Sequence, residues 1–163
     1  MKSTSPIFFL SAVVLWICYF QINTIAAEFY TSSQNNRYLI EIRNKYNWFQ
    51  SDAECKVNNM DLLSIESAEK MQEINDLINT VFKGKEKPLL YIGGNNLADR
   101  KQFLWTPTGH KFQYTNWSEF EPNNYEKNER CVHLGLYDDG TWNDIDCDMK
   151  FGFICEDNKQ VKT

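Results

Sequence analysis

The pattern of apolar residues predicts two helices: in the first stretch they suit one buried face, and in the second they recur at helical spacing. The first runs from Asn47 to Val57, where Asn47 followed by Gln50 has the pattern of a capping box. The second runs from Ser67 to Val81, with Ser67 as the residue that caps its start. The charged segment Lys83–Pro88 contains a glycine and predicts a turn after the second helix.

Short alternating or apolar runs predict strands, most of them in the second half of the chain. The expected strands are Arg37–Ile42, Leu89–Ile92, Gln102–Trp105, Cys131–Leu136 and Phe151–Glu156. The polar residues 28–36 predict a loose lead into the first strand. Residues 106–130 have little periodicity, and a loop of that length in a compact domain usually has a functional reason.

The beginning of the chain has the pattern of a secretory signal peptide. An almost unbroken apolar run, Ile7–Phe20, is followed by the small residues Ala26 and Ala27, which predicts cleavage near one of these two alanines. We therefore expect a signal peptide at 1–27, a single domain at 28–163 and a secreted, extracellular protein.

A membrane anchor is the alternative reading of this segment, since the run could extend towards Ile25. Gln21 and Asn23 interrupt it and leave it short for a helix that crosses a bilayer. No later stretch of the sequence is apolar enough to span a membrane, so we expect no membrane span in the mature protein.

Cysteine usage predicts disulfide bonds. Cys18 would leave with the signal peptide, and Cys55, Cys131, Cys147 and Cys155 remain. An even number of cysteines in a secreted chain is typical of disulfides, but their spacing allows three connectivities and does not choose among them. A zinc site is disfavoured because no closely spaced cysteine pair is present.

Charge and residue types exclude several classes of function. The 163-residue chain has a formal charge of −5 and no basic cluster, which argues against nucleic acid as a partner. His110 and His133 are the only histidines, and neither has a serine or cysteine partner in a catalytic pattern. We expect no enzyme. His133 could contact a ligand, but we interpret it as an ordinary strand residue.

Three carboxylates and two side-chain amides lie close together in the second half of the chain. They are Glu121, Asn123, Glu129, Asn143 and Asp144. Such oxygen ligands suit calcium, which takes about 6–8 of them, whereas zinc and copper favour imidazole or thiolate. Five side chains would leave coordination positions open, and a polyhydroxyl ligand could fill these positions.

The order and spacing of several short motifs resemble those of a C-type lectin-like domain of the small secreted, invertebrate-like kind. The resemblance covers roughly residues 38–156. Its motifs are Asn47-Trp48-Phe49, Leu62-Leu63-Ser64-Ile65, Tyr91-Ile92-Gly93-Gly94, Glu121-Pro122-Asn123, Trp142-Asn143-Asp144 and Gly152-Phe153-Ile154-Cys155. Each is weak alone, and their joint order makes the match specific. Tyr91 stands where the family more often has tryptophan.

The resemblance implies a fold and a bonding pattern. The fold would be α+β, with two helices that flank short antiparallel sheets, a long calcium-binding loop and two disulfides. The implied disulfides are Cys55–Cys155 and Cys131–Cys147. The family's bond before proline in the Glu121-Pro122-Asn123 motif is cis.

The resemblance also implies a role for each residue of the oxygen-rich cluster. Glu121, Asn123, Glu129, Asn143 and Asp144 match the family's principal calcium site one for one. Each would bind Ca²⁺ and also contact the sugar, the carboxylates as acceptors and the amide nitrogens as donors. Trp142 would anchor the last two ligands in the core. The implied partners are glycans or glycoproteins, for example on microbial surfaces, which would suit a role in innate immunity.

The sugar preference is left open by two opposing features. The order Glu121-Pro122-Asn123 resembles the mannose-binding members of the family. Tyr125, however, stands where family members place a side chain against the sugar ring, and an aromatic there favours galactose. Tyr125 also has the ordinary interpretation of an exposed loop tyrosine.

Other features of the resemblance stay open at this point. Asn124, Arg130 and Arg100 fall where the family's auxiliary calcium site has acidic ligands, so we expect that site to be absent or impaired. Asn116 begins a formal glycosylation sequon whose occupancy the sequence does not decide. The alternative function is a protein-binding C-type lectin-like domain without sugar binding. The oligomeric state is unknown.

Overall fold

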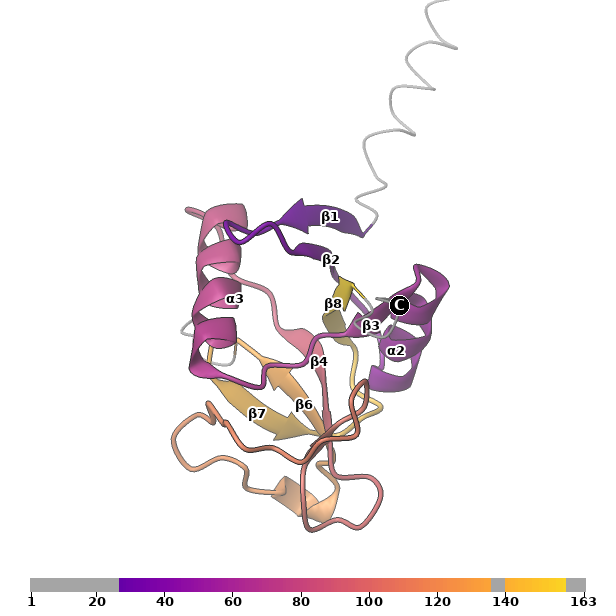
Figure 1. The fold of residues 1–163 in the computed structure, drawn as a ribbon. Coiled ribbons are helices and arrows are strands. Elements are labelled where there is room, and N and C mark those ends of the chain that lie inside the picture. Colours follow the sequence, from indigo (N-terminus) through magenta and orange to yellow (C-terminus); the bar gives the residue numbers. More distant parts are fainter. Residues whose placement is uncertain (1–26, 136–139, 158–163) are drawn as a thin grey trace, which may run out of the picture.

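The computed structural model describes residues 27–135 and 140–157, and their strands belong to one sheet (Figure 1). The strands are β1 (Glu28–Thr31), β2 (Arg37–Tyr46), β3 (Met60–Leu62), β4 (Leu90–Asn95), β5 (Leu104–Trp105), β6 (Cys131–Leu134), β7 (Trp142–Ile145) and β8 (Phe151–Asp157). Their order is β1-β2-β8-β4-β6-β7, with β3 on β8 and β5 on β4. All pairs are antiparallel except β4 with β8. The α+β class is confirmed.

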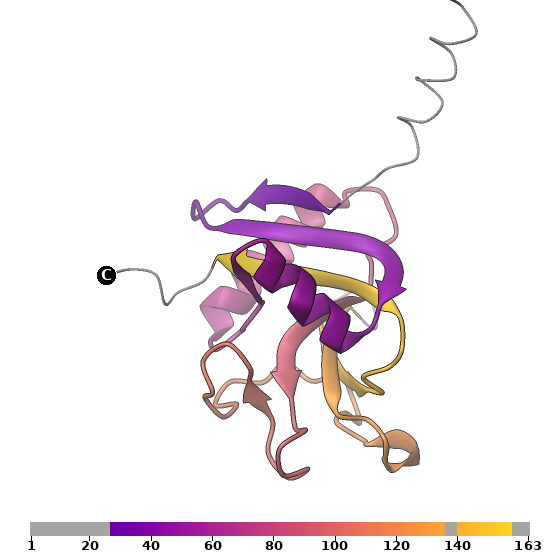
Figure 2. The same cartoon turned by 90° about the vertical axis from the view of Figure 1, so that its right-hand side faces the viewer.

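Two helices pack on opposite sides of the strands β2 and β8, as Figures 1 and 2 show. They are α2 (Trp48–Val57) and α3 (Ala68–Val81). The predicted capping box is present, because Gln50 N donates to Asn47 Oδ1 over 2.9 Å and Asn47 N donates to Gln50 Oε1 over 3.1 Å. Each helix starts one residue later than predicted, since a capping residue has extended backbone geometry.

The two helices cover two separate hydrophobic cores. The α3 core contains Ile74, Leu90, Trp105 and Trp142 among others, and the α2 core contains the cysteines of both disulfides. Trp142 is fully buried and meets Trp105 edge to face at a centroid distance of 5.5 Å. The prediction that Trp142 is a core anchor is therefore confirmed, and it fixes the start of β7.

Both disulfides implied by the family resemblance are present. Cys55–Cys155 joins α2 to β8 across 100 residues of sequence, and Cys131–Cys147 joins β6 to the segment after β7 across 16 residues. Closing loops of these lengths in the unfolded chain stabilises the fold by about 3–5 kcal/mol each.

The expectation of a loose lead at residues 28–36 is wrong. Residues 28–31 form β1, which pairs with β2 in register Glu28↔Ile40 to Thr31↔Arg37. The strand has four residues, and all but Tyr30 are exposed, so it has no apolar alternation that a sequence pattern could detect. The strand β1 is held in place by its pairing with β2 and by the contact of the β1–β2 turn with α3.

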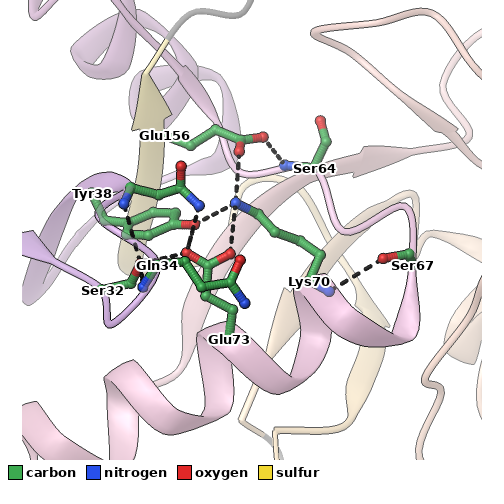
Figure 3. Close-up of polar contacts among 9 residues, drawn as sticks. Ser32, Gln34, Tyr38, Ser64, Ser67, Lys70, Glu73 and Glu156 are labelled. Atoms are coloured by element: carbon green, nitrogen blue, oxygen red, sulfur yellow. Dashed lines mark hydrogen bonds and ion pairs between the residues drawn. The ribbon is translucent and has the colours of Figure 1, made fainter.

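The turn between β1 and β2 is fastened to α3 by a buried polar network, drawn in Figure 3. The carboxylate of Glu73 accepts from Ser32 Oγ over 2.5 Å, from Asn36 Nδ2 over 2.8 Å and from the Tyr38 hydroxyl over 2.8 Å. Lys70 Nζ hydrogen-bonds the same hydroxyl and lies 3.6 Å from Glu73 and 3.2 Å from Glu156. We name Lys70, Glu73 and Glu156 the lysine-centred cluster.

Several strand boundaries also differ from the expected ones. β2 and β4 continue to Tyr46 and Asn95, beyond the predicted ends at Ile42 and Ile92, while β5 covers only the last two residues of the predicted Gln102–Trp105. β3 has three residues and no pattern of its own; it follows β8 in register from Met60↔Asp157 to Leu62↔Cys155. The position of such a short strand is set by its pairing with a neighbouring strand.

The predicted signal peptide lies almost entirely outside the described residues. Residues 1–26, with the expected signal peptide, are not described, so cleavage near Ala26 or Ala27 and the boundaries 1–27 and 28–163 stay predictions. Within the described residues, no helix has the length and apolarity needed to cross a membrane.

Candidate functional site

The predicted ligands lie on the long loop 106–130 and on the neighbouring strands β6 and β7. This loop extends from one end of the molecule, opposite the β1–β2 hairpin, and is drawn in orange in Figures 1 and 2. It is attached to β7 at its middle, where Trp142 N donates to Asn116 O and Ser118 N donates to Trp142 O, both over 2.8 Å. The buried Trp142 therefore positions the loop and the strand together.

Glu121, Asn123 and Asp144 are in direct contact. The Glu121–Pro122 bond is cis, as the resemblance implies. Asn123 donates its backbone N–H to Asp144 Oδ1 over 2.9 Å and its side-chain Nδ2 to Glu121 Oε1 over 2.9 Å. The Asn124 backbone N–H donates to Asp144 Oδ2 over 3.1 Å. Asp144, only 1% exposed, thus holds the loop by two backbone N–H groups.

Glu129 approaches the same place from the end of the loop. Its carboxylate is 8% exposed and accepts a hydrogen bond of 2.7 Å from the backbone N–H of Tyr125. Tyr125 opens the 3-10 helix η1 (Tyr125–Lys127), and its own side chain is 66% exposed. The ring of Tyr125 is therefore free to meet a ligand.

The carboxylates of the site repel one another. Burial raises the pKa of Glu121, and a hydrogen bond to Asp144 together with the negative charges of Asp144 and Glu129 raises it further. Burial also raises the pKa of Glu129, the charges of Asp144 and Asp146 act in the same direction, and the Tyr125 N–H opposes them. Among the described residues, no lysine or arginine forms an ion pair with Glu121, Glu129 or Asp144.

Asn143 lies on β7 with its amide turned towards β6. Its Nδ2 is 3.3 Å from His133 Nε2, and the two residues are direct partners in the strand pairing. His133 is a buried strand residue, as expected, and burial lowers its pKa to about 4, so the ring is neutral at pH 7. A neutral ring whose Nδ1 faces the Leu134 carbonyl at 3.4 Å offers Nε2 as an acceptor to the Asn143 amide. The sequence suggested no such contact, because it needs the strand register.

The donor set fits a hard cation in its chemistry. It consists of carboxylate and amide oxygens, which are the ligands that calcium prefers. In the described residues, however, no three Asp, Glu, His or Cys side chains are gathered closely enough to form a ready metal site. The carboxylate oxygens accept from loop N–H groups and from the Asn123 amide instead.

The residues expected at the auxiliary site are one amide and two arginines. Asn124 Oδ1 is buried and has no hydrogen-bond partner among the described residues. Arg130 donates to the carbonyl oxygens of Lys127 over 2.8 Å and Glu129 over 3.1 Å, which ties together the end of the loop. Arg100 has a left-handed backbone with φ of 60° and lies in the turn after β4. A guanidinium cannot bind a cation, so these residues do not fit an acidic calcium site.

Asn116 of the sequon is half-buried, and its Nδ2 donates to the Gly140 carbonyl over 3.3 Å. The atom to which a glycan would be attached, Asn116 Nδ2, therefore already forms a hydrogen bond that holds the loop. Occupancy of this sequon stays undecided.

Comparison with known proteins establishes the family. The sequence profile of the Lectin C-type domain matches residues 44–157. The chain is 38% identical over 154 residues to lectin subunit alpha of Sarcophaga peregrina, which covers 89% of this chain and 53% of that protein, so it spans about half the length of this relative. The chain belongs to the C-type lectin domain family, and its relatives are lectins rather than enzymes.

Solved structures agree with this fold. The cow C-type carbohydrate-recognition domain of CD23, crystallised in the presence of a GlcNAc2Man3 oligosaccharide, is 25% identical with a TM-score of 0.61, covering 74% of this chain and 86% of that one. A calcium-independent type II antifreeze protein is 22% identical with a TM-score of 0.64, covering 82% of this chain and 93% of that one. The second likeness shows the fold alone, and the fold by itself does not decide which ligand is bound.

Proposed function

We propose that this chain is a secreted lectin that binds glycans through a calcium ion held by Glu121, Asn123, Glu129, Asn143 and Asp144. One observation carries the proposal: Glu121 and Asp144 both contact Asn123, Glu129 holds the same loop through the Tyr125 N–H, and within the described residues none of these three carboxylates forms an ion pair with a basic side chain. Burial, together with the negative charges of neighbouring carboxylates, raises the pKa values of Glu121 and Glu129, which supports a site where a positive charge would be favourable. A divalent cation would supply it.

The proposed roles follow from what each side chain offers. The carboxylates of Glu121, Glu129 and Asp144 would bind the cation as charged oxygens, and Asn123 and Asn143 would add amide oxygens. When bound, calcium would take up two neighbouring hydroxyl groups of a sugar. The carboxylate oxygens that remain would accept from those hydroxyls, and the amide nitrogens would donate to them.

Binding of the cation would require Asn123 to exchange partners. Its Nδ2 now donates to Glu121 Oε1, and both side chains belong to the proposed ligand set. This internal hydrogen bond competes with the cation, so we expect calcium to reorganise the loop around Glu121 and Asn123. The N–H groups of Asn123 and Asn124 already hold Asp144 and can keep it in place during that change.

Two classes of sugar are candidates for the proposed site, mannose-type sugars and galactose. The order Glu121-Pro122-Asn123 supports the mannose type. Tyr125, with 66% of its surface exposed directly after the motif, can stack on the apolar face of galactose. We favour mannose-type ligands, because donor and acceptor positions on the calcium decide which pair of hydroxyls fits.

The test is isothermal titration of the protein with methyl mannoside and with methyl galactoside, in excess calcium and then in EDTA. We expect binding of one sugar in calcium and none in EDTA. Glu129→Gln removes one ligand charge and should weaken calcium binding by about 10- to 100-fold or more. Glu126→Gln is the matched control, because Glu126 is an exposed carboxylate of the same loop outside the proposed ligand set.

Two results would contradict the proposal. Sugar binding that survives EDTA would remove the calcium from the mechanism. Binding of neither sugar in calcium, with an intact fold, would favour the alternative of a protein-binding domain without sugar binding.

A further inference from the structure

Phe120, directly before the Glu121-Pro122-Asn123 motif, is exposed without an evident structural reason. It has 85% of its surface exposed, the largest value for a large hydrophobic side chain among the described residues. Its ring belongs to neither hydrophobic core in the described chain. An aromatic ring left in water contributes nothing to the stability of the fold.

The backbone at Phe120 is also unfavourable for phenylalanine. Residues 118–121 form a four-residue turn closed by Glu121 N donating to Ser118 O over 3.1 Å, and Phe120 is its third residue with φ of 68°. A positive φ at that position ordinarily selects glycine or asparagine, because a bulky side chain there is strained. The chain therefore keeps a phenylalanine at a place where glycine would fold better.

The same loop concentrates further strained residues. Asn124, Glu126 and Lys127 have φ values of 48°, 52° and 61°, and they enclose the exposed Tyr125. Strain of this kind gathers at ligand-binding sites, where the surrounding structure holds residues in position for the ligand. Phe120 and Tyr125 thus stand on either side of the motif in sequence, both exposed and both next to residues of the proposed site.

We propose that Phe120 is a platform for a second sugar residue, so that the natural ligand is at least a disaccharide. This inference rests on the proposed function: the first sugar residue would bind the calcium and meet Tyr125, and the adjoining residue would lay its apolar face on the Phe120 ring. The polarised C–H groups of a sugar face meet the negative face of an aromatic ring favourably. The ring would then determine specificity for glycan length.

The surroundings of Phe120 favour a saccharide over an apolar partner. Its neighbours in sequence are Glu119, Glu121 and Pro122, and Glu119 and Pro122 are exposed. A single ring among polar groups matches a sugar, which has an apolar face bordered by hydroxyl groups. A protein or membrane contact would need a contiguous apolar patch of some hundreds of Å².

The experiment compares affinities for a methyl monosaccharide and for a disaccharide of the same sugar, in calcium, by isothermal titration. The wild-type protein should bind the disaccharide about 3- to 10-fold more tightly. Phe120→Gly should lose this difference, keep the monosaccharide affinity and unfold at the same or a higher temperature, since glycine suits the turn. Phe120→Tyr should retain the preference.

Phe29→Ala is the matched control, because Phe29 is 53% exposed on β1, at the opposite end of the molecule (Figure 1). It should leave both affinities unchanged. If Phe120→Gly keeps the wild-type preference for the disaccharide, or if the wild type has no such preference while it binds the monosaccharide, the inference is overturned and the proposed function stands. If the wild type binds no monosaccharide in calcium, both fail.

Discussion

Two groups of acidic side chains in the described part of the chain differ in how their charge is balanced. The lysine-centred cluster has its own cation: the Lys70 ammonium lies between the carboxylates of Glu73 and Glu156 (Figure 3). The loop group of Glu121, Glu129 and Asp144 has no such partner among the described residues. The first group contains its own balancing charge, whereas the proposed function gives the second group a cation from solution.

The pKa values follow this difference. Burial by itself would raise the pKa of Glu73, but hydrogen bonds from Ser32, Asn36 and Tyr38 and the charge of Lys70 lower it below its ordinary value. The pKa values of Glu121 and Glu129 are raised, because burial and neighbouring negative charges act together. Similar side chains thus stabilise structure in one place and, on the proposed function, form a binding site in the other.

The largest effect is expected from removing the internal cation. Lys70→Met leaves Glu73, which is 3% exposed, without the ammonium that lies 3.6 Å from its carboxylate. We expect the free energy of unfolding to fall by about 3 kcal/mol, as for other buried ion pairs that lose one partner. Urea unfolding measures this change, and Lys45→Met serves as the control because Lys45 is exposed.

The comparison also predicts that Lys70→Met does not affect the proposed calcium site. Calcium-dependent sugar affinity should be unchanged in Lys70→Met, since Lys70 and Glu73 bind Tyr38, Ser32, Asn36 and Glu156 rather than Glu121, Glu129 or Asp144. A loss of calcium affinity in Lys70→Met, measured where the variant is folded, would show that the two groups are coupled. It would contradict the prediction that they act independently.

The second prediction concerns pH, where the two groups should act with opposite sign. The lowered pKa of Glu73 means that its contribution to stability is present above the ordinary value of 4.5 and is lost as pH falls through the folded-state pKa. The raised pKa values of Glu121 and Glu129 mean that, without calcium, these groups favour the folded state at low pH and lose that contribution as pH rises.

Calcium should therefore stabilise the protein most above the raised pKa values of Glu121 and Glu129 and progressively less as pH falls through them, because protons and metal compete for the same carboxylates. The measurement is the unfolding temperature from pH 4 to pH 8, with calcium and with EDTA, together with retention on a sugar column. More calcium should shift the midpoint of sugar release to lower pH. A midpoint that does not respond to calcium concentration would place the titrating groups elsewhere.

The smallest expected effect is a change of sugar preference without loss of binding. Glu121→Gln combined with Asn123→Asp exchanges a carboxylate and an amide on either side of Pro122 and so reverses the donor and acceptor positions around the cation. We expect the ranking to shift towards galactose, with Tyr125 as the stacking surface. A glycan array compares the double variant with the parent, and an unchanged ranking would mean that donor orientation does not decide specificity.

The sequence by itself determined the features that depend on local chemistry. Helical spacing and capping residues placed both helices to within one residue, because the capping box of Asn47 and Gln50 acts within a single turn. The motif resemblance gave the family and the two disulfides. It also named the oxygen ligands, whose role as a calcium site remains a proposal.

Only the tertiary structure decided the features that join distant residues. β1 exists because β2 and the side chain of Glu73, 41 residues after Ser32, hold a polar segment that has no pattern of its own. The contact of His133 with Asn143 depends on strand register. The sequence does not distinguish Phe120 from an ordinary loop residue; its positive φ and its exposure are known only from the structure. Sequence patterns report local preferences, whereas charge balance, register and strain arise when separate segments meet.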